Sequence, residues 1–166
     1  YTDGVTSNIQ TQLDSKGVAN RPVVTARKGS DQTISRNTWT KITGFTDNYD
    51  SDNAWSGSRF TVPSGKAGRY LCSANVRVKF DSAGSDGEQA IGAFYVNGGQ
   101  KTHFFQLSMA NGNRHMGIVG GTGSIILDLA VGHYVEVYGY MQDDSPSGSL
   151  KIHGDSSTGS QVGFMR

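Results

Sequence analysis

The sequence predicts an all-β domain in which two antiparallel sheets pack face to face. Glycine is frequent, with 23 residues against 3 prolines in a chain of 166. Most glycines fall between short segments rich in Val, Ile, Thr, Phe and Tyr, as expected of many strands joined by turns. Several segments alternate apolar and polar residues with a period of two, which is typical of strands with one dry face. Leu, Glu and Lys, which fill ordinary helices, are sparse.

The expected strands follow one another from residue 22 to residue 165. Alternation is clearest around Val76, Val78 and Phe80, and again around Val135 and Val137. In the second segment the opposite face carries Glu136, Tyr138 and Tyr140, so tyrosines are expected on the outside of a sheet. The full set is Pro22–Arg27, Thr38–Thr43, Arg59–Val62, Gly68–Phe80, Ala90–Val96, Lys101–Met109, Gly123–Leu129, Tyr134–Gln142 and Thr158–Met165.

Turns between these strands are marked by their residue types. Asn97-Gly98 and Asn111-Gly112 supply the positive φ angles that tight hairpins require. We also expect loops at Gly120-Gly121 and over Ser145–Ser149, which contains Pro146 and Gly148.

The first twenty residues differ from the rest and form a separate segment. Val5, Ile9 and Leu13 recur there at helical spacing among polar neighbours. A helix this short is marginal in water by itself, but three copies side by side can bury the apolar stripe as a brief coiled coil. The alternative is a plain linker. The sequence thus predicts a stalk or linker at residues 1–20 and a β-domain at residues 21–166.

Composition limits the partners and the stabilising chemistry. Only 17% of residues are charged and the net charge is +1, so no strong field is expected to attract nucleic acid. Insertion into a membrane is not expected, because no apolar stretch approaches the roughly twenty residues that span a bilayer. The single cysteine, Cys72, cannot form a disulfide within the chain and is expected to be a small buried apolar side chain.

No residue pattern predicts catalysis or a cofactor. The sequence has no Gly-x-Ser-x-Gly motif, and no Lys-Ser or Lys-Thr follows the glycines at 120–123, so neither a hydrolase elbow nor a phosphate loop is expected. The four histidines are scattered, and a zinc ion could be held only if three chains each donated one on an axis. Asp47, Asp50 and Asp52 form an acidic segment that we interpret as a solvated loop, with structural calcium as the alternative.

Aromatic residues are more numerous than one thin sandwich readily hides. Trp39 precedes an alternating strand and is expected in the core, whereas Trp55 sits in a polar loop. There Trp55 either stacks on a sugar or a partner or folds back over its own sheet. About half of the remaining rings are expected in the core and the others at a subunit interface, with a monomer carrying aromatic surface spots as the alternative. These rings are Phe94, Tyr95, Phe104, Phe105, Tyr134, Tyr138 and Tyr140.

Four segments in order resemble the C1q/TNF-like jelly rolls. They are Trp39–Asp50, R-F-T-V-P-S-G-K-A-G-R-Y at Arg59–Tyr70, F-Y-V-N-G-G at Phe94–Gly99 with Ser124–Val137, and Ser156–Met165 with its Gly-Phe pair. The resemblance implies a C1q/TNF-like jelly-roll sandwich that forms a homotrimer about a threefold axis. The trimer interface is then expected at Val5, Ile9, Leu13, Phe104, Tyr134, Tyr138, Tyr140 and Phe164.

The opening segment resembles a different context. V-T-S-N-I-Q-T-Q-L-D-S-K, at Val5–Lys16, is similar to linkers that precede terminal domains in bacteriophage tail-fibre and head-fibre proteins, and no collagen repeat is present. The resemblance implies a non-enzymatic protein on the virion surface, either a capsid decoration or a fibre tip that stabilises the particle or mediates host attachment. Its expected partners are its own copies, the major capsid protein or other virion proteins, and a host cell-surface glycan or receptor.

The alternative is a carbohydrate- or receptor-binding, lectin-like adhesin module of a secreted bacterial protein. For such binding, at a fibre tip or in an adhesin, the candidates for ligand contact are polar loop residues. These residues are Asp50, Asp52, Trp55, Gln142, Asp143 and Asp144.

Overall fold

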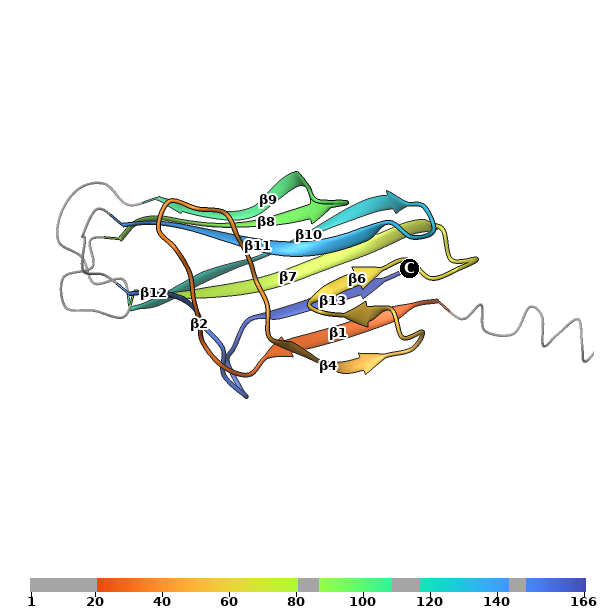
Figure 1. Ribbon diagram of the computed structural model, residues 1–166, viewed down its shortest axis with the longest axis horizontal. Helices are drawn as coiled ribbons and strands as arrows, with labels where there is room; N and C mark the ends of the chain where they lie inside the picture. The colour runs from red at the N-terminus through yellow and green to blue at the C-terminus, as the bar shows by residue number, and fades with distance from the viewer. Residues whose placement is uncertain (1–20, 81–86, 109–116, 144–148) are drawn as a thin grey trace, which may run out of the picture.

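The structure, a computed structural model, describes residues 21–80, 87–108, 117–143 and 149–166, and all regular structure in these ranges is β-strand. The strands form two antiparallel sheets, as the alternation predicts (Figure 1). The expected stalk at residues 1–20, the Asn111-Gly112 turn and most of the Ser145–Ser149 loop lie outside the described residues.

Sheet A contains the first and last strands of the domain. Its order is β2 (Gln32–Thr33), β12 (Leu150–Ile152), β7 (Gly68–Phe80), β13 (Gln161–Met165), β1 (Val23–Lys28) and β4 (Phe45–Asp50), with β10 (Ile118–Leu129) paired along the other edge of β7. The closing strand β13 thus lies between β7 and β1, and Met165 is paired with Leu71 on one side and with Val23 on the other.

Sheet B contains the strand in which tyrosines alternate with buried residues. Its order is β5 (Trp55–Ser56), β6 (Arg59–Thr61), β11 (Tyr134–Asp143), β8 (Gly87–Val96) and β9 (Gly99–Ser108), with β3 (Thr40–Lys41) also paired with β11. The predicted turn at Asn97-Gly98 joins β8 to β9, with φ angles of 52° and 80°. That turn prediction is confirmed.

The core lies between the sheets and follows the predicted alternation. Val76, Val78 and Phe80 of β7 are buried, and so are Val135 and Val137 of β11. Rings fill one end of this space: Phe60 stacks on Phe164 with centroids 4.8 Å apart and touches Tyr70 at 5.3 Å. Cys72 is fully buried, and burial raises the pKa of its thiol to about 12, so the prediction of an inert apolar side chain is confirmed.

The predicted loop at Gly120-Gly121 is wrong, because both residues lie inside strand β10. A Cβ atom at Gly121 would stand 2.4 Å from Cβ of Phe105, and one at Gly123 would stand 2.5 Å from the carbonyl oxygen of Phe104. Gly121 therefore makes room for the side chain of Phe105, and Gly123 makes room for the backbone of Phe104. Tertiary packing, and not turn formation, accounts for them.

Other differences concern short strands. The sequence did not predict β2, β4, β5 and β12, which are two to six residues long and lack clear alternation. Asp47 and Asp50 consequently lie on β4 and not in a loop with Asp52, which corrects the solvated-loop interpretation.

Candidate functional site

The outer face of sheet B carries a cluster of rings that we call the aromatic face, formed by Trp39, Tyr95, His103, Tyr138 and Tyr140. The ring of Trp39 lies 5.4 Å from Tyr140, 5.4 Å from His103 and 6.0 Å from Tyr95. Tyr95 stacks on Tyr138 at 3.9 Å. Trp39 lies directly before β3, and the other rings lie on β8, β9 and β11. The aromatic face therefore covers the middle of the sheet.

An ion-pair network lies next to these rings. Glu136 is 3% exposed, and its Oε1 accepts hydrogen bonds from Nζ of Lys41 at 2.7 Å and from Nε of Arg59 at 2.8 Å. Burial alone would raise the pKa of Glu136, but the bonds from Lys41 and Arg59 outweigh it and hold the pKa below its usual value. The Arg59 guanidinium also lies 3.9 Å over the ring of Tyr134. This part of the face is therefore satisfied by its own side chains.

The two tryptophans lie in different parts of the fold. Trp39 is half-buried on the aromatic face, so its assignment to the core is wrong. Trp55 folds back instead, with its ring 6.0 Å from Phe45 and 5.9 Å from Phe164, and packs against the core. The reading in which Trp55 covers its own sheet is thus confirmed.

The outer face of sheet A is different in character. Four apolar residues, Val23, Met165, Leu71 and Ile126, are paired in one line across β1, β13, β7 and β10, and we call this line the apolar row. Met165 is 49% exposed, Leu71 39% and Ile126 66%. Large apolar side chains in line and open to solvent are a typical mark of an interaction surface.

Beside the apolar row the same face is hollowed. Two positions further along the strands, Thr25, Gly163, Ser73 and Ser124 are paired in a line of small residues. A Cβ atom at Gly163 would lie 2.9 Å from Oγ of Ser73. A shallow hollow of about 240 Å³ opens here, lined among others by Thr25, Ser73 and Gly163. An apolar row beside a hollow suits the close approach of another surface.

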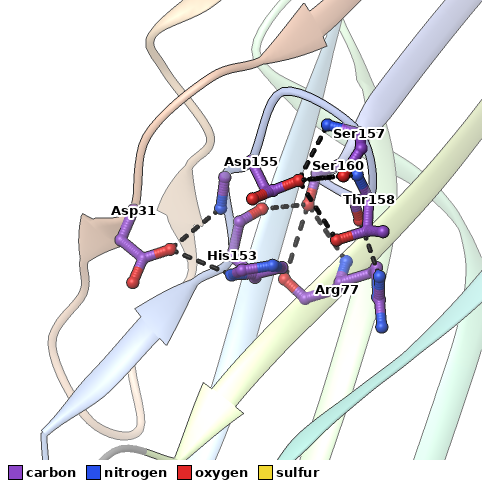
Figure 2. A network of polar contacts seen from close by, with 8 residues as sticks. Asp31, Arg77, His153, Asp155, Ser157, Thr158 and Ser160 are labelled. Atoms are coloured by element: carbon purple, nitrogen blue, oxygen red, sulfur yellow. Dashed lines mark hydrogen bonds and ion pairs between the residues drawn. The ribbon is translucent and has the colours of Figure 1, made fainter.

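A polar network holds the loop between β12 and β13 (Figure 2). Oδ1 of Asp31 accepts hydrogen bonds from the backbone N–H of Gly154 and from Nδ1 of His153, both at 3.0 Å. Oδ1 of Asp155 accepts from the hydroxyl and the backbone N–H of Ser157, which hold the pKa of Asp155 well below its usual value. These bonds shape a turn.

Ser, His and Asp are close together in this network but are not arranged for nucleophilic catalysis. The Ser160 hydroxyl donates to the backbone carbonyl of His153 at 2.9 Å and accepts from the backbone N–H of Arg77 at 3.0 Å. Ser160 is completely buried, and no hydrogen bond joins it to the imidazole in the described residues. The imidazole therefore has no access to the proton that a general base would remove.

The predicted contact residues do not form one site. Asp50 accepts hydrogen bonds from the backbone N–H groups of Ala54 and Trp55 at 2.9 and 2.8 Å, so its carboxylate caps the β4–β5 turn that contains Asp52. Gln142 and Asp143 lie at the far end of β11, roughly 25 Å along the strand from the pairing with β6, and Asp144 is outside the described residues. The described candidates for ligand contact therefore lie at two separate places.

The predicted interface residues are also divided. Val5, Ile9 and Leu13 lie outside the described residues. Phe164 is 1% exposed, so the prediction that it contacts another chain is wrong, and Phe104 packs against the core with its ring 4.9 Å from Phe94. Tyr134, Tyr138 and Tyr140 are half-buried on the outer face of sheet B.

The sequence reasoning missed the apolar row. A signal for Leu71 was present, since alternation within Gly68–Phe80 places it on the same face as Arg77 and Lys79. Its alignment with Ile126 and Met165 depends on strand register, which no local pattern reports.

In the described ranges no group of three or more His, Cys, Asp or Glu side chains is placed to hold a metal ion. Among the same residues no helix has the length and apolarity to cross a membrane.

No protein-family model matches the sequence, and no curated protein is similar to it. Solved structures do match. Eiger TNF from S. frugiperda is 9% identical, with a TM-score of 0.60 over 88% of this chain and 92% of that chain. Murine APRIL at pH 5.0 is 14% identical, with a TM-score of 0.55 over 89% and 99% of the two chains. The globular domain of zebrafish complement 1qA is 11% identical, with a TM-score of 0.53 over 86% and 94%.

These likenesses establish the fold. The chain is a C1q/TNF-like jelly roll of two antiparallel sheets, as the four sequence segments imply.

Proposed function

We propose that the chain is a non-enzymatic, homotrimeric module that serves structure or receptor binding, and that it acts on the surface of a bacteriophage virion. There it decorates the capsid or forms the tip of a head or tail fibre, stabilises the particle or attaches it to the host, and contacts the major capsid protein or other virion proteins. The virion setting is supported by the resemblance of residues 5–16 to phage fibre linkers.

The observation that carries the trimer is the outer face of sheet A. The apolar row leaves Leu71, Ile126 and Met165 open to solvent beside a hollow of small residues. Covering such side chains with a copy of the same chain stabilises by about 25 cal/mol for each Å² of apolar surface removed from water. In a closed ring of three copies, a neighbour covers the outer face of sheet A on every chain, so no copy leaves this face open to solvent.

Mass measurement tests the oligomer. Size-exclusion chromatography with light scattering on the whole chain is expected to give about three times the chain mass of 17.7 kDa. A folded monomer at micromolar concentration would contradict the proposed trimer. The virion setting needs a separate test, in which a labelled antibody against this chain is imaged on intact phage particles; absence of label from the particle surface would contradict it.

A second candidate function is recognition of a carbohydrate, either at a fibre tip or in a secreted bacterial adhesin. The aromatic face favours it, because half-buried rings of Trp39, Tyr138 and Tyr140 can stack on the apolar faces of sugars while tyrosine hydroxyls donate hydrogen bonds. A glycan array with the wild-type chain and a Trp39→Ala variant is expected to show a ligand whose binding the variant loses. Equal glycan binding by the wild type and the Trp39→Ala variant would exclude the aromatic face as the binding site.

A further inference from the structure

Three arginines that are far apart in the sequence surround one hollow at an end of sheet A. The hollow has a volume of about 270 Å³ and is lined by Arg21, Gly68, Arg69 and Arg166. Sheet topology brings them together, because β13 lies between β1 and β7 and ends where those two strands begin (Figure 1). The backbone N–H of Arg166 also donates to the carbonyl of Pro22 at 3.2 Å, which ties the end of β13 to the start of β1.

Gly68 sets the position of one of these guanidiniums. Its φ angle is 149°, a value that residues with a side chain rarely adopt, and a Cβ atom there would lie 3.0 Å from Nε and 3.4 Å from Nη2 of Arg166. The Arg166 guanidinium therefore rests against the bare backbone of β7. A side chain at position 68 would press on this guanidinium, which would have to shift by a few tenths of an ångström.

The hollow concentrates positive charge in a chain that is nearly neutral. The chain has 15 Lys and Arg against 14 Asp and Glu, yet every charged side chain that lines the hollow is an arginine. Asp128 lies opposite Arg69 in the β10–β7 ladder, but no ion pair joins a carboxylate to Arg21, Arg69 or Arg166 among the residues that the structure describes. Three like charges around one space repel one another unless an anion lies between them.

We propose that this hollow, which we call the arginine pocket, binds a sulfate or phosphate group. The guanidinium is a planar fork of N–H donors that matches oxyanions in a bidentate way, and three forks can satisfy several oxygens of one tetrahedral group. The group is either a free ion or an ester carried by a polysaccharide or a lipid. This inference does not depend on the trimer or on the virion setting.

Calorimetric titration of the whole chain with sodium sulfate, against sodium chloride at equal ionic strength, tests the proposal. Sulfate is expected to bind, and Arg69→Gln and Arg166→Gln are each expected to weaken binding by about tenfold or more, as loss of a charge-assisted bond predicts. Lys101→Gln, which removes one exposed charge on β9, is the matched control and is expected to bind as wild type does. Absence of sulfate binding to the wild type, or an equal loss in Lys101→Gln, would overturn the proposal.

A charge-neutral variant separates geometry from net charge. Gly68→Ala changes no charge, but its Cβ atom presses on the guanidinium of Arg166 and occupies a backbone φ of 149° that side chains rarely adopt, so it is expected to weaken sulfate binding as well. Circular dichroism checks that each variant folds, and if Gly68→Ala does not, Arg166→Lys replaces it because it keeps the charge and loses the bidentate fork. If Gly68→Ala, or Arg166→Lys in its place, folds and binds sulfate with wild-type affinity, the proposed geometry is contradicted.

Competition experiments identify the source of the group. A sulfated oligosaccharide and vesicles with a phosphorylated lipid headgroup are each titrated against bound sulfate. Displacement at lower concentration than free sulfate indicates an ester on that carrier, and displacement by neither indicates the free ion; all three results require the arginine pocket to bind sulfate first.

Discussion

The outer faces of the two sheets differ in how far their side chains are covered and paired within the chain. On sheet B, Trp39 lies over Tyr140 and Glu136 is enclosed by Lys41 and Arg59, so large side chains and charges satisfy one another within the chain. On sheet A, small residues leave a hollow and the apolar row is open. One fold thus presents one face whose side chains satisfy one another and another whose large apolar side chains stay open to solvent. The tyrosines that suggested an interface, Tyr134, Tyr138 and Tyr140, lie on the first of these faces.

The largest expected effect concerns the core beneath both faces. Phe164→Ala removes a ring that stacks on Phe60 and lies 5.9 Å from Trp55, so the free energy of unfolding is expected to fall by about 4 kcal/mol. Chemical denaturation of wild type and variant measures the difference. A change in subunit association with unchanged unfolding would mean that Phe164 acts at an interface after all.

The next effect separates the two outer faces. Ile126→Lys places a charge in the apolar row and is expected to weaken association of the chains by about 100-fold or more, as for the loss of a central contact residue. Gln106→Lys, which places the same charge on exposed β9 of sheet B, is the control and is expected to leave association unchanged. Analytical ultracentrifugation over a concentration series measures both. If both substitutions weakened association equally, the two outer faces would not differ as interaction surfaces.

A smaller effect concerns the ion-pair network of sheet B. Glu136→Gln removes the negative charge that Lys41 and Arg59 share, and the free energy of unfolding at pH 7 is expected to fall by about 1–2 kcal/mol. Thermal denaturation of the two proteins measures it. Lys41→Gln is the matched control, because it leaves Glu136 paired with Arg59 and is expected to cost less.

The same network predicts a pH dependence. The pKa of Glu136 in the folded chain lies below the ordinary value of 4.5. Its stabilisation is therefore present above pH 4.5 and is lost as pH falls through the folded-state pKa. The stability difference between wild type and Glu136→Gln is expected to shrink in that acid range, and a difference that stays constant from pH 7 to pH 3 would contradict the assignment.

The smallest effect is spectroscopic. Burial raises the pKa values of Tyr95 and Tyr138 above the ordinary 10.0, so their hydroxyls remain donors throughout the neutral range. In an absorbance titration at alkaline pH, the late-ionising component is expected to become smaller in the Tyr95→Phe, Tyr138→Phe double variant, and the part that remains is assigned to Tyr70. Tyr70 also has a raised pKa and remains in both proteins as the internal reference.

Alternation predicted the long strands well because it reports which face of a strand is dry. β7 was expected at its observed bounds, and the buried sides of β7 and β11 were correctly identified. The short strands β2, β5 and β12 were not predicted, since two or three residues carry no detectable period. Gly120 and Gly121 were misread for a related reason. Gly120 makes room for the backbone of β7 and Gly121 for the side chain of Phe105, and such glycines have the same letter as one that forms a turn.

The sequence by itself determined the fold class, the dry faces of the long strands, the inert cysteine and the segments that resemble C1q/TNF-like jelly rolls. These properties depend on composition and on neighbours within a few residues. Only the tertiary structure decided that Trp39 lies outside and Trp55 inside, that Leu71, Ile126 and Met165 form one row, and that Arg21, Arg69 and Arg166 share a pocket. The physical reason is strand register: residues up to 145 positions apart become neighbours only when backbone hydrogen bonds between sheet strands fix which residues face each other.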